Sequence, residues 1–208
     1  MSGINNPYAQ GGWVNPQNPY SINDPRGSGA PPPSIYGALP YSQSQGPPRF
    51  VEFQFTGLNP DVLNCIVMGP NARHCYTIAT SPASSNSPSV TGIRNDRGVV
   101  VAKIEWYQRP SVEAPEFLPK QYAGQWMPLS NDMSHRTLLV NGRPYALTTN
   151  DGSLQLYNTA YNPPELLAKI SRTHTAVVLN VTQEGVHRGI LEVSVLIATL
   201  LYSGRRID

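Results

Sequence analysis

Apolar and polar residues alternate with a period of two along much of the chain from Phe50 onward. Such alternation is typical of half-buried β-strands, and the first predicted strand covers Phe50–Phe55. Short turn sequences separate the alternating stretches, and Asn141-Gly142 is the strongest hairpin signal among them. The pattern predicts further strands at Leu63–Met68, His74–Thr80, Val90–Arg94, Val99–Tyr107, Thr137–Val140, Pro144–Thr149, Leu154–Tyr157, Leu166–Ser171 and Thr175–Val181.

Strands at this spacing, with no long amphipathic helix between them, predict an antiparallel barrel or sandwich. The proline-rich segment Pro110–Met133 is expected to hold short edge strands and loops. A weak internal repeat links Tyr76–Thr80 with Tyr145–Thr149, and Val101–Ile104 with Leu167–Ile170. Duplication of a half-barrel would produce this repeat, and so would the shared chemistry of β-hairpins.

The C-terminal segment Ile190–Tyr202 changes character, because Val195–Tyr202 is apolar on almost every side. Ser203-Gly204 and Arg205-Arg206 suit the end of a helix, so we expect a helix at about residues 190–203. A helix that is hydrophobic all round must be surrounded. A bilayer-spanning helix needs about 20 residues. We therefore favour a helix inside the lumen of a β-barrel, with a segment that dips into a membrane as the alternative.

Residues 1–48 contain ten of the 21 prolines, seven of the 17 glycines and four tyrosines, with Asp24 and Arg26 as their only charged residues. So few aliphatic side chains cannot offset the entropy of ordering the chain, which predicts a disordered arm over 1–48 and a folded domain over 49–208. The arm either binds a partner or acts as a spacer.

The composition and charge of the chain indicate which partners and which cellular compartment to expect. The net charge of +2, with 13% charged residues, predicts no nucleic-acid partner. No signal peptide and no apolar run of membrane-spanning length is visible, so we expect a cytoplasmic protein without a transmembrane span.

The two cysteines, Cys65 and Cys75, are interpreted as small hydrophobic residues, and whether they interact is left open. The histidines show no metal-ligand spacing, and no phosphate-binding loop or nucleophile motif is visible, so we expect no metal, no cofactor and no catalytic residue.

Several short motifs resemble an uncharacterised domain family of mushroom-forming fungi (basidiomycetes). They are Pro32–Pro40, Phe53–Phe55, Thr91–Arg94, Val101–Trp106 and Val195–Leu201. The resemblance implies the architecture of the tubby, LURP-one and phospholipid-scramblase group, an antiparallel closed barrel of about twelve strands around a hydrophobic C-terminal helix. Tubby domains bind phosphoinositides through basic side chains, but none of those positions can be matched to this chain residue by residue.

Basic residues at repeat-related positions suggest where a ligand binds. Lys103 and Lys169 occupy equivalent places in the repeat, and Arg172 and His174 follow nearby. Together they form a candidate anion-binding patch, with an ordinary solvated barrel exterior as the alternative. The sequence thus predicts a non-catalytic module that binds anionic phospholipid head groups or protein partners at a membrane surface. A structural protein that self-associates through its arm is the alternative function, and no oligomeric state is predicted.

Overall fold

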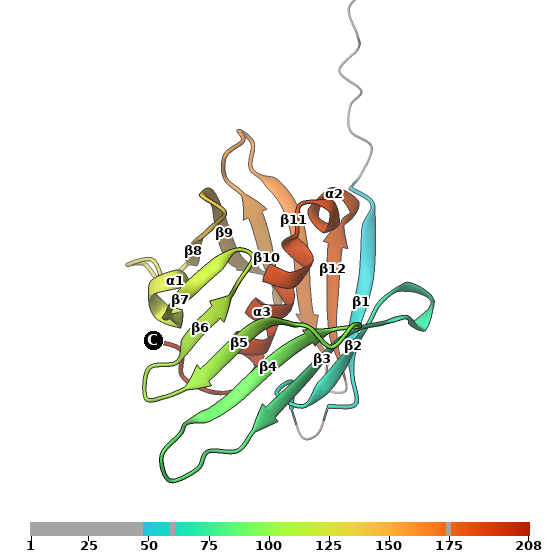
Figure 1. Cartoon of the computed structure of the whole chain (residues 1–208). Helices are drawn as coiled ribbons and strands as arrows, with labels where there is room; N and C mark the ends of the chain where they lie inside the picture. Colours follow the sequence, from blue (N-terminus) through green and yellow to red (C-terminus); the bar gives the residue numbers. More distant parts are fainter. Residues whose placement is uncertain (1–47, 59–60, 174–175) are drawn as a thin grey trace, which may run out of the picture. The chain divides into compact units, whose positions relative to one another are not determined.

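Twelve antiparallel strands form the part of the chain that the structure describes (Figure 1). The structure is a computed structural model that describes residues 48–208, except 59–60 and 174–175. The chain divides into two units, Met1–Pro47 and Pro48–Asp208. The prediction of a disordered arm over residues 1–48 therefore lies outside the described residues, apart from Pro48.

The ten strands and the C-terminal helix for which the sequence predicted ranges follow those ranges to within two residues at each end, whereas α2 was not expected. The strands are β1 (Phe50–Thr56), β2 (Cys65–Met68), β3 (His74–Ser81), β4 (Ser89–Asn95), β5 (Val100–Trp106), β6 (Ser111–Ala114), β7 (Leu118–Tyr122), β8 (His135–Val140), β9 (Arg143–Asn150), β10 (Ser153–Asn158), β11 (Glu165–Arg172) and β12 (Val177–Thr182). The helices are α1 (Ala123–Trp126), α2 (Gln183–His187) and α3 (Ile190–Tyr202), and η2 (Pro70–Ala72) is a 3-10 turn.

The strands form a meander in which the first and the last strand also pair. Each strand pairs with the next along the chain, except that β7 and β8 form the two ends of the sheet order. In the pair β1–β12, Phe53 lies opposite Leu179 and Phe55 opposite Val177, and all four side chains are buried. The sheet is thus a nearly closed barrel, which confirms the predicted mainly β fold of about twelve antiparallel strands.

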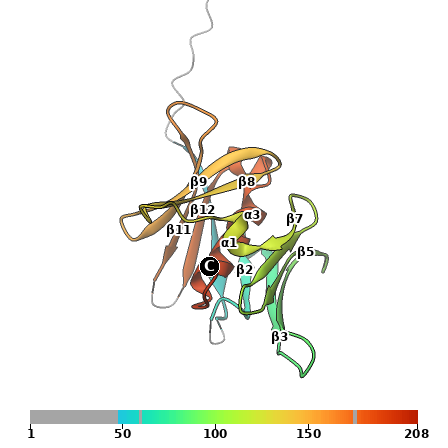
Figure 2. The ribbon, with the colours of Figure 1, turned by 90° about the vertical axis from the view of Figure 1, so that its left-hand side faces the viewer.

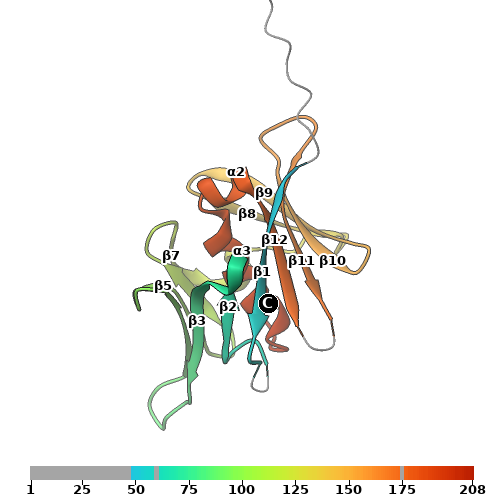
Figure 3. The same cartoon turned by 90° about the vertical axis from the view of Figure 1, so that its right-hand side faces the viewer.

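The C-terminal helix α3 lies inside this barrel and packs against β5, β11 and β12 (Figures 1 and 3). Ten of its thirteen residues are buried. The prediction of a helix enclosed by strands is confirmed, because the only way to bury an apolar surface on every side is to surround it with protein. Gly189 (φ 75°) precedes α3 in the left-handed region, where the chain turns out of α2. None of the described helices has the length and apolar character needed to cross a bilayer.

The hairpin and repeat signals agree with the observed strands. Asn141 (φ 50°) and Gly142 (φ 74°) join β8 to β9 with positive φ at both positions, as a two-residue type I′ turn requires. The repeat places Tyr76 of β3 in correspondence with Tyr145 of β9, and both rings are buried. These strands are six apart in chain order, as are β5 and β11. A six-strand spacing is what duplication of a half-barrel predicts.

Where β7 and β8 do not pair, the barrel has a seam. The proline-rich segment there forms the short strands β6 and β7 and the helix α1, as expected from its sequence. The free edge of β8 is covered by the segment after α1, because Thr137 N–H donates to the Pro128 carbonyl and Ser130 N–H to the His135 carbonyl. The edge strand β7 contains Pro119, which has no N–H to offer to another strand.

Residues 203–208 close the seam from the other side, and we call them the C-terminal strap. The strap runs from α3 to lie beside α1 (Figure 2). Ile207 is 6% exposed within the hydrophobic core, and Asp208 forms an ion pair with Arg136 of β8. The seam is therefore filled by side chains and loops instead of a strand pair.

Candidate functional site

The structure separates the residues of the predicted anion patch. Lys103 is on β5 and Lys169 on β11, which are six positions apart in the order of the twelve strands, so they lie on opposite walls of the barrel. Arg172 ends β11, and its guanidinium lies 5.6 Å from the centre of the Tyr202 ring. His174 lies outside the described residues. The described members therefore do not form one patch, since repeat-related positions lie across a barrel from each other.

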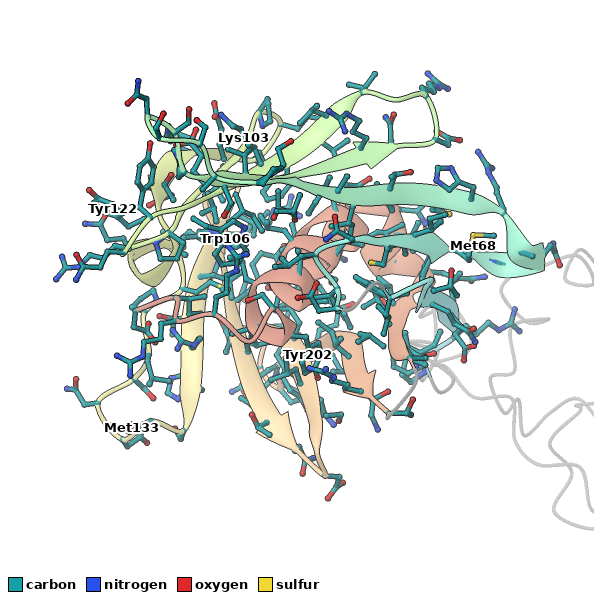
Figure 4. The ribbon with its side chains drawn as sticks, turned by 90° about the horizontal axis from the view of Figure 1, so that it is seen from below. Met68, Lys103, Trp106, Tyr122, Met133 and Tyr202 are labelled. Atoms are coloured by element: carbon teal, nitrogen blue, oxygen red, sulfur yellow. The ribbon has the colours of Figure 1, made fainter. Side chains whose placement is uncertain are left out.

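A cleft of about 1050 Å³ lies instead on the outer face of β5, β6 and β7, next to the strap. We call it the β5–β7 cleft. A row of paired residues crosses it, in which Glu105 of β5 lies opposite Ser111 of β6, and Ser111 opposite Tyr122 of β7. Figure 4 shows Lys103, Trp106 and Tyr122 on this side of the barrel, away from Met68.

Glu105 is a buried charge that lines the cleft, with 8% of its surface exposed. Lys103 Nζ donates to its Oε1 (2.6 Å) and Lys120 Nζ to its Oε2 (2.7 Å). These hydrogen bonds hold the pKa of the Glu105 carboxyl below its usual value of 4.5, against the opposing effect of burial. Lys103 is thus the partner of an internal carboxylate, which reduces its availability to an external anion.

Two tyrosines and two arginines stand at the rim of the cleft. Tyr107 is 56% exposed and Tyr122 is 49% exposed, so both rings are accessible to a ligand. Arg109 follows β5 and Arg206 belongs to the strap, and both are exposed. No ion pair between described residues uses either guanidinium, so both are available to a ligand.

The strap is held in place from both sides. Arg205 stacks over the ring of Trp106, with the guanidinium carbon 4.7 Å from the ring centre, and donates to Ser89 Oγ (2.9 Å). Both carboxylate oxygens of Asp208 accept from Arg136, at 2.8 and 2.6 Å. This pairing lowers the pKa of Asp208. Arg206 lies between these two anchors, so they fix the segment that presents it to the cleft.

The cysteines do not form a disulfide, and both thiols are free. Cys65 lies opposite Ile78, and its Sγ donates to the Val62 carbonyl (3.3 Å). Burial raises the pKa of Cys65 to about 12, so this thiol stays protonated. No cluster of three or more metal-ligating side chains occurs among the residues that the structure describes.

Arg109 and Arg206 were not recognised as site residues from the sequence. In the sequence, Arg206 indicates only the end of the C-terminal helix, and Arg109 lies just before the proline-rich segment. One signal was present: Tyr107-Gln108-Arg109 is an aromatic and polar run directly after a strongly alternating strand. Nothing in the sequence, however, indicated that the strap and this turn would meet.

No protein-family model and no curated protein matches this chain. Among solved structures, an X-ray structure of a protein from Arabidopsis thaliana matches over 74% of this chain and 92% of that chain, with 11% sequence identity and a TM-score of 0.43. Neither finding assigns a function to the β5–β7 cleft.

Proposed function

We propose that the protein is a non-catalytic binding module that recognises anionic groups through the β5–β7 cleft, on phospholipid head groups or on protein partners at a membrane surface. The observation that carries this proposal is the pair of arginines without an ion-pair partner among the described residues, Arg109 and Arg206, at the rim of the cleft. A guanidinium matches the two oxygens of a phosphate or carboxylate with a planar fork of donors.

The acidic residues of the cleft do not cancel this positive charge. Glu105 is neutralised by two lysines and Asp208 by Arg136. The charge left over for a ligand therefore comes from Arg109 and Arg206, together with one of the two lysines that share Glu105. Tyr107 and Tyr122 support a membrane surface as the place of action, because tyrosine rings favour the interface between lipid and water.

The chemistry of the titratable groups supports a binding role over catalysis. Glu105 holds both oxygens against ammonium groups and has a lowered pKa, which makes it a poor general base. The Cys65 thiol is buried and protonated, and so is a poor nucleophile. Two free thiols also support a cytoplasmic location for the module.

The proposed relationship to the basidiomycete domain family, and through it to tubby, LURP-one and scramblase-like domains, is supported by the architecture. Twelve antiparallel strands enclose a C-terminal hydrophobic helix, as that resemblance implies. The alternative of a structural protein rests on the arm, residues 1–48, and no observation on the described residues favours it.

Flotation with vesicles, with and without anionic phospholipid, tests the proposal on the full chain. Each basic residue near an anionic membrane contributes about 1 kcal/mol. The double variant Arg109→Glu/Arg206→Glu is thus expected to weaken binding at least about thirtyfold. The matched control, Lys169→Glu/Arg172→Glu, makes the same change of charge on the opposite wall and is expected to bind nearly as the wild type.

Two outcomes would contradict the proposal. If the wild-type protein binds neither anionic vesicles nor an acidic polypeptide, the proposed binding role is wrong. Loss of flotation in the Lys169→Glu/Arg172→Glu variant alone, with its thermal unfolding unchanged, moves the site to β11, which holds two of the four residues of the patch expected from the sequence.

A further inference from the structure

The β5–β7 cleft is larger than the capture of a single anionic group requires. Its volume of about 1050 Å³ is at the upper end of the range for sites that enclose drug-sized ligands. Tyr107 and Tyr122 both line it, so aromatic side chains contribute to the apolar surface of the cleft. A ligand that fills the cleft must therefore combine an anionic group with an extended body that has flat apolar faces.

Three glutamines add uncharged polar groups to the cleft. Gln108, Gln121 and Gln125 all line it, and no hydrogen bond between described residues engages their side-chain amides. Each amide offers two donors and one acceptor in a plane. Neighbouring hydroxyl groups on a sugar ring each donate and accept, so a planar amide can bond two of them at once. The C–H face of the same ring packs against an aromatic side chain.

The charges of the cleft limit how anionic the ligand is. Besides Arg109 and Arg206, the lining contains the carboxylates of Glu105 and Asp208. Each of these carboxylates has a basic partner, so the cleft keeps a small excess of positive charge and not a dense cationic cluster. A ligand with one carboxylate on each ring fits two separate guanidinium groups better than a cluster of phosphates does.

We infer that the β5–β7 cleft binds an acidic saccharide, a short chain of sugar rings that carry single carboxylates, with Tyr107 and Tyr122 stacking on the rings and Arg109 and Arg206 pairing with the carboxylates. This inference rests on the proposed function, because it names the ligand class of the same site. The sugar acid can belong to a free oligosaccharide or to the head group of a lipid, and the chemistry of recognition is the same.

The test uses the full chain and a hexamer of galacturonic acid, with the fully methyl-esterified hexamer as the neutral match. Calorimetric titration is expected to show saturable binding of the acid, and binding of the ester at least about tenfold weaker because the guanidinium pairs are lost. The variant Tyr107→Ala/Tyr122→Ala is expected to lose about tenfold in affinity for the acid. Tyr161→Ala is the control, because Tyr161 is equally exposed (54%) and does not line the cleft.

Experiments with vesicles distinguish the two sources of the sugar acid. They also distinguish failure of the saccharide inference from failure of the proposed function. Competition of the free hexamer with vesicles that carry a glucuronic-acid lipid supports one shared site for both sources. Vesicles of phosphatidylserine that bind through Arg109 and Arg206, while the hexamer does not bind, overturn the saccharide inference and leave the proposed function standing. Failure of hexamer, acidic peptide and vesicles overturns both.

Two further results also overturn the inference. If the Tyr107→Ala/Tyr122→Ala variant binds the hexamer with unchanged affinity, the tyrosines do not stack on the sugar rings and the binding is only electrostatic. Equal affinity for a glutamate hexapeptide assigns the cleft to acidic proteins, since a peptide of this kind has no sugar face to stack on the tyrosines.

Discussion

Glu105 illustrates how one residue on the outer face of a strand becomes a structural centre. The period-two pattern of β5 places it on the outside of the barrel, next to Lys103, and the pairing with β6 and β7 brings Ser111 and Lys120 over it. A buried carboxylate is tolerated only when both oxygens are satisfied. Glu105 meets this condition through two lysines from different strands, and so it connects β5 with β7 across β6.

Replacement of this carboxylate should therefore reduce stability in a pH-dependent way. Because the folded-state pKa of Glu105 is lowered, its contribution is present above about pH 4.5 and is lost as the pH falls through that lowered pKa. Glu105→Gln is expected to reduce the free energy of unfolding by about 2 kcal/mol at neutral pH. The difference from the wild type should narrow below pH 4.5, as measured by urea unfolding at several pH values.

Glu113→Gln on β6 is the matched control, because Glu113 lies opposite Lys103 in the register but forms no ion pair among the described residues. If Glu105→Gln lowers the free energy of unfolding by the same amount at all pH values, then packing, and not charge, holds Glu105 and its strand neighbours together.

At the scale of elements, α3 shows what full burial demands of a helix. Thr199 Oγ1 donates to the Val195 carbonyl (2.8 Å), so its hydroxyl is satisfied inside the helix. Ser194 is also fully buried, but its Oγ has no hydrogen-bond partner among the described residues. An unsatisfied buried hydroxyl costs about 1–3 kcal/mol, so Ser194 weakens an element that is otherwise apolar.

Removal of that hydroxyl should stabilise the barrel. Ser194→Ala is expected to raise the free energy of unfolding by about 1 kcal/mol, because the polar group disappears and alanine is the better helix former. The comparison is Thr199→Val, which removes a satisfied hydroxyl from the same helix and should not stabilise. Denaturant unfolding of both variants in parallel measures the two changes in the free energy of unfolding. A lower free energy of unfolding in Ser194→Ala would show that this hydroxyl does have a partner.

For the whole molecule, the seam between β7 and β8 is the point at which the ring of strands depends on other contacts. The strap and the segment after α1 meet at Arg136, which donates to the Met127 carbonyl (2.7 Å) as well as to Asp208. This one side chain therefore joins β8, the loop that covers its edge and the strap. Because the strap also presents Arg206, the seam and the β5–β7 cleft share a structural element.

Loss of Arg136 should open the seam and leave the rest of the barrel intact. In Arg136→Met, backbone amides of β8 and of the strap are expected to exchange with deuterium faster, while β1 and β12 keep their protection. Binding at the cleft should weaken in the same variant because Arg206 is no longer held. Arg143→Met on the neighbouring strand is the control, since Arg143 is exposed and forms no ion pair among the described residues. Uniform exchange in both variants would mean that the strap does not depend on Arg136.

How well the sequence predicted each feature depends on how far apart the interacting residues lie along the chain. Strand limits, the Asn141-Gly142 turn and the edge character of the proline-rich segment were predicted correctly, because each depends on neighbours within a few positions. The repeat matches β5 with β11, which lie six places apart in the strand order, and it suggested a patch that includes Lys103 and Lys169. Equivalent positions in two halves of a barrel face opposite directions, and a linear pattern does not contain that information.

The sequence by itself determined the type of element along most of the folded domain and the need of Ile190–Tyr202 for an enclosure, because both follow from local periodicity and from hydrophobic burial. Only the tertiary structure decided where the ring of strands stays open and what fills the opening. The β5–β7 cleft arises there from Arg109 and from Arg206, which is almost a hundred residues further along the chain. Such a meeting is set by barrel closure and by the path of the strap, and these depend on the packing of all twelve strands.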